Sequence, residues 1–443
     1  MSTHAHPARS ADALCRLSAT EAAACIAAGD LESEALMRAC LERIERREPE
    51  LRAWVQVDAE GALRAAREAD RQRRANAHPL GPLHGVPIGV KDVIAAAGLR
   101  TECNSEIYLG QPAHRDAAVV ALLRAAGAIV LGKTETVEFA AWGGRVAPTG
   151  NPHDLSRTPG GSSTGSAAAV ADCMVPLALG TQTGGSIIRP ASFCGVVGFK
   201  PTFGTVSTEG VHPYAPTLDS VGWYARSVED AALLAHVLEV CDEPMPQPRA
   251  LDGLRVGLCR TPYWDRSQAE TWAALAEASR RLTAAGAVVT ELELGAEFAT
   301  LNDDRQTVMW AQGRVSFLHL QRTAPDKLSP GIRKSMERIG NAKLGAALDR
   351  VAELRPRFDA MASEFDAVMT PSAPGEAPVG VAFTGDAIFN GLWTALHVPC
   401  ISLPGLTGPH GMPVGIQLVG ARYSDARLLA VAQTVGRLLS AAG

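Results

Sequence analysis

The sequence contains no apolar run long enough to cross a bilayer, although 47% of its 443 residues are hydrophobic. A membrane-spanning helix needs about 20 consecutive apolar residues, so we expect no membrane partner. An excess of positive charge is also lacking: the formal net charge is −5, and the basic residues are scattered along the chain. Because binding to nucleic acid depends on clustered positive charge, we expect no nucleic-acid partner either.

The patterns of metal sites and disulfide frameworks are missing as well. The nine cysteines are widely spaced with no C-x-x-C pair, and the eleven histidines include no H-x-x-x-H or similar cluster. An odd number of widely spaced cysteines is typical of reduced thiols in a cytoplasmic protein. Residues 1–13 have no apolar centre and do not resemble a secretory signal. We therefore expect a cytoplasmic protein without a bound metal.

The order of apolar segments predicts one large α/β domain. Helical periodicity dominates the first 75 residues, and from residue 83 short apolar runs broken by Gly and Pro alternate with helical patterns. Buried strands between helices indicate a large mixed β-sheet covered by helices on both faces. We expect N-terminal helices (1–80), a catalytic core (81–240), a helical insert (about 300–364) and a C-terminal core (365–443). Within the insert, Pro356 predicts a kink or a break in an amphipathic helix.

Two familiar motifs occur in surroundings that exclude their usual functions. Residues 127–134 match the phosphate-loop pattern G-x-x-x-x-G-K-[ST], but the four residues between the glycines are apolar and would themselves be a strand. Their amides would then bond within the sheet rather than face an anion. Residues 161–165 match G-x-S-x-G, but the turn-forming residues 151–160 replace the strand that a nucleophile elbow requires. We expect neither nucleotide binding nor an α/β-hydrolase site.

A glycine- and serine-rich stretch between residues 160 and 186 contains two turns. The first leads into the alanine-rich residues 167–171 and predicts hydroxyl groups and free amides at the start of a helix. The second, from Gly180 to Ser186, follows a buried strand at 175–179. Glycines in such a turn let successive N–H groups point at a developing negative charge beside a serine. A serine needs a base to become a nucleophile, so these turns indicate catalysis only if a base lies nearby.

Lys91 is the candidate base, because it ends the apolar strand 86–90. Burial lowers the pKa of a lysine by desolvation, towards the range in which it accepts protons near neutral pH. The alternative is a lysine in a salt bridge, with Asp92 as the obvious partner. The sequence alone leaves both interpretations open.

Together these segments resemble the amidase signature family, whose hallmark is a Ser–Ser–Lys triad. The likeness is most specific at residues 83–92, 158–170, 180–186 and 191–202, extends over most of the chain, and is weakest at 300–364. The resemblance implies a single amidase-signature domain and an amidohydrolase that forms an acyl-enzyme. It implies that no metal or organic cofactor is needed.

The resemblance also implies a role for each motif residue. Ser186 would be the nucleophile, Lys91 the base, and Ser162 the bridging serine, next to a cis peptide bond. Ser163 would orient Lys91. The backbone N–H groups that would form the oxyanion hole belong to Thr183, Gly184, Gly185 and Ser186.

Three residues depart from the family pattern. Gln182 stands where an Asp is usual, and Thr164 replaces a glycine. Ile188 stands where an Arg is usual, and the next residue, Arg189, is an arginine. Losing both members of a charged pair costs less than losing one, because an unpaired buried charge is the expensive state. Thr164 would alter the first turn if that position required a positive φ. Because no triad member is lost, we expect the departures to affect the substrate rather than the chemistry.

The expected substrate is a small-molecule amide or carbamate. The candidate pocket residues are Trp142, Gly143, Gln182 and Trp393. An acyl-enzyme mechanism would serve amides, esters and carbamates alike, so a carbamate-specific hydrolase (urethanase) is one alternative. A glutaminase subunit of a tRNA-dependent amidotransferase, working with a protein partner and tRNA, is another. An inactive scaffold is a third, against which the intact triad argues. A homodimer is left open.

Overall fold

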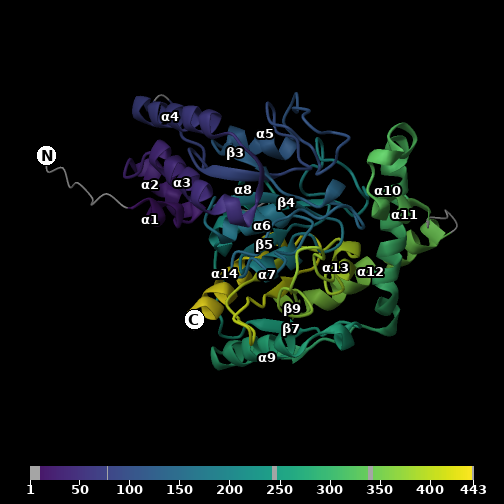
Figure 1. Ribbon diagram of the computed structural model, residues 1–443. Helices are drawn as coiled ribbons and strands as arrows, with labels where there is room; N and C mark the ends of the chain where they lie inside the picture. The colour runs from purple at the N-terminus through teal and green to yellow at the C-terminus, as the bar shows by residue number, and fades with distance from the viewer. Residues whose placement is uncertain (1–9, 77, 242–246, 338–342, 442–443) are drawn as a thin grey trace.

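A mixed β-sheet of eleven strands forms the centre of the molecule (Figure 1). The computed structural model describes residues 10–76, 78–241, 247–337 and 343–441. In their order across the sheet, the strands are β1 (Trp54–Val57), β3 (Ile129–Thr134), β2 (Pro87–Lys91), β4 (Leu177–Gln182), β6 (Ser220–Ala225), β5 (Val197–Lys200), β10 (Cys400–Leu403), β11 (Ile416–Val419), β9 (Ala367–Pro371), β7 (Arg255–Leu258) and β8 (Val288–Glu291). Strands β3, β2 and β4 are parallel to one another, whereas β4 and β6 are antiparallel, so the predicted mixed sheet is confirmed.

Helices cover both faces of this sheet. They are α1 (Ala11–Cys15), α2 (Ala19–Ala28), α3 (Ser33–Leu51), α4 (Ala59–Ala75), α5 (Ala118–Ala125), α6 (Thr164–Ala171), α7 (Ile188–Cys194), α8 (Val228–Val237), α9 (Ala269–Ala284), α10 (Leu301–Thr323), α11 (Pro330–Glu337), α12 (Leu344–Ser363), α13 (Gly391–Ala395) and α14 (Asp425–Ser440). In β4, Leu177 and Leu179 pack in the core that includes α5 and α8, while Ala178 packs in the core that includes α3 and α6. This alternation follows from the two-residue period of a strand.

The N-terminal helices and the insert lie at opposite ends of the molecule (Figure 1). The N-terminal segment is not purely helical, because β1 pairs with β3 at one edge of the sheet. In the insert, α12 continues through Pro356 without a break. Pro356 lies on the exposed side of α12, where water can solvate the carbonyl group that loses its partner. In the described part of the chain, no helix is long and apolar enough to cross a membrane.

Helix α6 carries the first glycine-serine turn into the centre of the fold. All eight of its residues, Thr164–Ala171, are at least partly buried and seven are fully so, which requires small side chains on every face. A Cβ at Gly165 would lie 2.1 Å from the carbonyl oxygen of Ala53, so only glycine allows α6 to approach the residue before β1 this closely. The sequence Gly-Ser-Ala-Ala-Ala thus places the start of α6 against the sheet.

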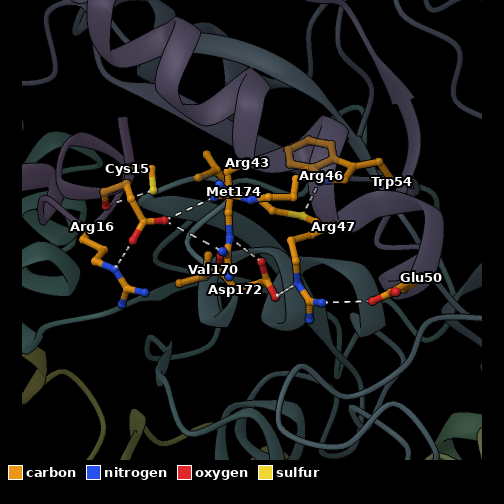
Figure 2. Close-up of polar contacts among 12 residues, drawn as sticks. Cys15, Arg16, Arg43, Arg46, Arg47, Glu50, Trp54, Val170, Asp172 and Met174 are labelled. Atoms are coloured by element: carbon orange, nitrogen blue, oxygen red, sulfur yellow. Dashed lines mark hydrogen bonds and ion pairs between the residues drawn. The ribbon is translucent and has the colours of Figure 1, made fainter. Parts of the chain in front are cut away.

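Asp172 anchors the other end of α6 to the N-terminal helices, as Figure 2 shows. Its carboxylate accepts hydrogen bonds from Arg43 Nε (2.7 Å) and Arg47 Nε (2.9 Å), both on α3. The Asp172 side chain is only 3% exposed, whereas that of Asp12, which pairs with Arg16 and Arg46, is 50% exposed. Removing a buried carboxylate that two arginines share costs far more stability than removing an exposed one.

We expect Asp172→Asn to lower the free energy of unfolding by about 2–3 kcal/mol, because it removes the buried carboxylate that Arg43 and Arg47 share and leaves them only the exposed carboxylates of Asp12 and Glu50. Urea denaturation followed by circular dichroism measures the change. Asp12→Asn is the matched control, and we expect it to shift the urea midpoint little. Equal effects of the two substitutions would contradict the anchoring role of Asp172.

Candidate active site

Lys91 lies at the end of β2, where no described carboxylate pairs with it. Its side chain is fully buried, and Nζ donates hydrogen bonds to Ser162 Oγ (2.7 Å) and Thr181 Oγ1 (2.8 Å). Among the described residues, Lys91 has no ion pair, and Asp92 pairs instead with Lys133 Nζ at 3.1 Å. Asp92 faces away from Lys91 because successive residues of a strand point to opposite faces.

The pKa of Lys91 is therefore set by burial. Desolvation holds this pKa well below its usual range, and the negative charge of Asp219 opposes the effect only in part. The pKa of Lys133 is also lowered by burial, but its ion pair with Asp92 counteracts the shift. Of these two buried lysines, Lys91 is thus the one without a carboxylate partner, and the salt-bridge interpretation does not describe it.

The two serines of the first turn take different roles. Ser162 lines a cavity of about 640 Å³, and the peptide bond between Gly161 and Ser162 is cis. Ser163 does not contact Lys91 directly: Ser163 Oγ donates to the carbonyl oxygen of Thr181 (3.2 Å) and accepts from its N–H (3.3 Å). Ser163 is therefore linked to Lys91 through Thr181, and its role in orienting Lys91 stays a prediction. The sequence did not point to Thr181, although it shares a strand face with Thr183, two residues further along.

The second turn, residues 183–186, lines the same cavity and ends at Ser186. Three hydrogen bonds fix the position of this turn. Thr183 Oγ1 donates to Asp219 Oδ1 (2.6 Å). The carbonyl groups of Gly184 and Ser186 accept hydrogen bonds from Thr394 Oγ1 (2.7 Å) and from the Tyr224 hydroxyl (3.0 Å), respectively. Three side chains that sequence reasoning missed, those of Asp219, Thr394 and Tyr224, thus hold this turn.

The amides of the second turn are available to an anion. Within the described residues, no hydrogen bond uses the N–H of Thr183, Gly184, Gly185 or Ser186 as its donor. Ser186 is partly exposed and Ser162 is 5% exposed, and both line the cavity. No hydrogen bond joins their side chains in the described part of the chain; catalytic contacts of this kind often tighten only around a bound substrate.

The four pocket candidates divide into two pairs. Trp142 and Gly143 line the cavity, whereas Gln182 and Trp393 do not. Trp393 is fully buried and packs against Phe358, with ring centroids 5.1 Å apart. Gln182 points to the strand face opposite Thr181 and Thr183, which explains why it misses the cavity. We therefore assign neither Gln182 nor Trp393 to the pocket.

Gln182 instead supports the helix that follows Ser186. Its Oε1 accepts hydrogen bonds from the N–H groups of Ile187 (2.9 Å) and Ile188 (3.1 Å), and its Nε2 donates to Thr394 Oγ1 (3.1 Å). Ile188 is completely buried in an apolar cluster. A neutral cap and an apolar residue thus replace the two charged residues usual at these positions, which leaves no unpaired charge.

Thr164 fits the first turn without strain. It is the first residue of α6, it is absent from the positive-φ residues, and its hydroxyl donates to the Glu135 carbonyl (3.1 Å). The position therefore tolerates a side chain, and this departure leaves the turn intact.

The comparisons with known proteins agree with this geometry. The family model for amidases matches residues 35–429. The chain belongs to the amidase family. A glutamyl-tRNA(Gln) amidotransferase subunit from Chloroflexus aggregans is 34% identical to it over 472 aligned positions, which cover 95% of this chain and 96% of that protein.

Solved structures extend the agreement to the whole fold. A crystal structure of an amidase matches with a TM-score of 0.86 and 29% identity, over 96% of this chain and 100% of that one. The peptide amidase from Stenotrophomonas maltophilia matches with a TM-score of 0.80 and 28% identity, over 95% of this chain and 96% of that one. The family and fold predictions are confirmed, and this amidase is a hydrolase of C–N bonds.

The state of Lys91 leads to a pH prediction. A base works only when unprotonated, so kcat/KM should fall as acid protonates Lys91 and should reach a plateau above its lowered pKa. A pH profile of amide hydrolysis measures this limb, and Lys91→Ala should remove most of the activity at every pH. Activity that keeps rising towards the ordinary lysine pKa of about 10.4 would contradict a desolvated Lys91.

Proposed function

We propose that this amidase cleaves the C–N bond of a small amide through an acyl-enzyme on Ser186, with Lys91 as the base and Ser162 between them. The observation that carries the proposal is the contact of a fully buried, unpaired Lys91 with Ser162 Oγ at 2.7 Å. A lysine held in this state supplies a lone pair, and the hydroxyl beside it offers a path for the proton. Neither a helix cap nor a structural ion pair would need such a lysine.

Each proton lost in the proposed steps is gained by a named group. Ser186 Oγ attacks the substrate carbonyl carbon, its proton passes to Ser162 Oγ, and the proton of Ser162 passes to neutral Lys91. The oxyanion of the tetrahedral intermediate accepts hydrogen bonds from the free N–H groups of residues 183–186. The lysine then returns a proton through Ser162 to the leaving nitrogen as the C–N bond breaks. Water attacks the ester by the same relay and releases the acid and Ser186.

Among the proposed functions, the sequence relatives support a glutaminase subunit better than a free-standing amidase. The similarity to the amidotransferase subunit from Chloroflexus aggregans extends over nearly the full length of both chains. A chain acting in this way would hydrolyse the side-chain amide of glutamine beside a protein partner. It would also work with tRNA, contrary to the expectation drawn from its scattered basic residues. Carbamates and esters remain candidate substrates, because each acyl-transfer step is shared.

Ser186→Ala should lower kcat/KM by at least about 1,000-fold on every substrate, since it removes the atom that forms the acyl-enzyme. The measurement is a hydrolysis panel of aliphatic amides, anilides, aryl carbamates and L-glutamine. Cys194→Ala is the control, because Cys194 is buried, its thiol donates to the Pro159 carbonyl (3.4 Å), and burial raises its pKa. Activity that survives in Ser186→Ala and disappears in Cys194→Ala would overturn the assignment.

The same panel separates the two main candidates. A free-standing amidase should hydrolyse simple amides as the isolated chain. A glutaminase subunit should prefer glutamine and gain activity when its partner proteins are added. Rapid hydrolysis of anilides or carbamates, with no activity on glutamine even when the partner proteins are added, would exclude the glutaminase role.

A further inference from the structure

Arg305 enters the cavity from the insert, the part of the chain least similar to the family pattern. It lies in the second turn of α10 and lines the cavity together with Ser162 and Ser186. A Cβ built on Gly184 would lie 3.1 Å from Arg305 Nη1. The guanidinium group is therefore close to the turn that carries the nucleophile.

Arg305 has few partners within the protein. It forms no ion pair with a described residue, its Nε is buried without an acceptor, and its Nη1 contacts only the sulfur of Met309 (3.2 Å), a weak acceptor. Buried polar groups are nearly always satisfied, and a guanidinium group without acceptors is costly. An acceptor from a bound molecule would relieve this cost.

Arg189 adds a second positive charge to the same cavity. It is 6% exposed, its Nη2 donates to the Gly161 carbonyl (2.5 Å), and its Nε is buried without an acceptor. Burial lowers the pKa of Arg189 to about 10; the charge of Arg305 adds to this shift, and the charge of Asp386 opposes it. The positive charge of Arg305 thus disfavours that of Arg189, which a shared anion would reverse.

The acidic residues of the cavity, Asp303 and Asp386, favour the charged form of Arg305 from a distance, but neither forms an ion pair with Arg305 or Arg189 in the described part of the chain. Asp386 forms its ion pair with Arg266 (3.0 Å), and both of these side chains are largely exposed. Asp303 lies at the cavity wall, and no ion pair between described residues includes it. The inner part of the cavity, next to Ser186, therefore carries an excess of positive charge.

We propose that Arg305, assisted by Arg189, binds a carboxylate group of the substrate, so that the substrates are amides that carry a free carboxylate a few bonds from the scissile carbonyl. This inference rests on the proposed acyl-enzyme at Ser186. A guanidinium group matches the planar geometry of a carboxylate and forms charge-assisted hydrogen bonds to it. The nearness of Arg305 to Gly184 favours short substrates such as the monoamides of dicarboxylic acids, a class that includes glutamine.

The test compares glutaramate with hexanamide, a neutral amide of similar length. The wild-type protein should prefer glutaramate, and Arg305→Met should reduce this preference about 10- to 100-fold, as the loss of charge-assisted hydrogen bonds predicts. Arg305→Lys should retain part of the preference. Arg314→Met is the matched control, since it removes the same charge from α10 outside the cavity and should leave the preference unchanged.

A wild-type protein without preference for glutaramate, or an Arg305→Met variant that loses both activities equally, would overturn the proposal. Calorimetric titration with glutarate supplies a readout that needs no turnover: Arg305→Met should weaken glutarate binding, and Ser186→Ala should not. Covalent labelling by a fluorophosphonate that is lost in Ser186→Ala reports the proposed nucleophile separately. If the wild-type protein is not labelled but binds glutarate in a way that depends on Arg305, the acyl-enzyme alone is rejected. If the wild-type protein is labelled but does not bind glutarate, the carboxylate site alone is rejected.

Discussion

The site depends on one buried lysine without a carboxylate partner among the described residues, Lys91 at the end of β2. Burial would be unfavourable for its protonated form, and the fold surrounds its Nζ with the hydroxyl groups of Ser162 and Thr181 rather than with a carboxylate. The nearby carboxylate of Asp92 is occupied by Lys133, on the other face of the strand. This division keeps one lysine as a structural cation and leaves the other as a base.

The rest of the core brings two glycine turns to this base. Helix α6 fits against the sheet because its residues are small, and Asp172 ties its far end to Arg43 and Arg47 (Figure 2). Strand β4 lies beside β2 and delivers the second turn, whose carbonyl groups are held by Thr394 and Tyr224. The side chain of Thr183 and the carbonyl groups of Gly184 and Ser186 have partners, whereas the amides of the turn donate no hydrogen bond in the described residues. This arrangement exists before a substrate binds.

The mixed sheet and the segments that meet at Lys91 could be predicted from the sequence because their signals are local. Glycine turns, a strand-end lysine and alternating apolar runs each occupy a few consecutive residues. The contacts that join distant segments could not be predicted in this way. Thr181 and Asp219 are recognised only once their strands are paired, and Gln182 was assigned to the pocket because its position in the motif does not reveal its strand face. Arg305 lies in an insert with no motif at all.

In the proposed mechanism, chemistry and specificity come from different parts of the chain, and their proximity limits what each can do. A carboxylate bound to Arg305 cancels a positive charge next to Gly184, where the oxyanion develops. The arginine that selects such a substrate would then no longer be free to stabilise the oxyanion, and the backbone amides of residues 183–186 would have to do so alone. Those amides carry no other hydrogen bond in the described residues and are free for this role, and Gln182, on the opposite strand face, supports α7 without adding a charge near the oxyanion.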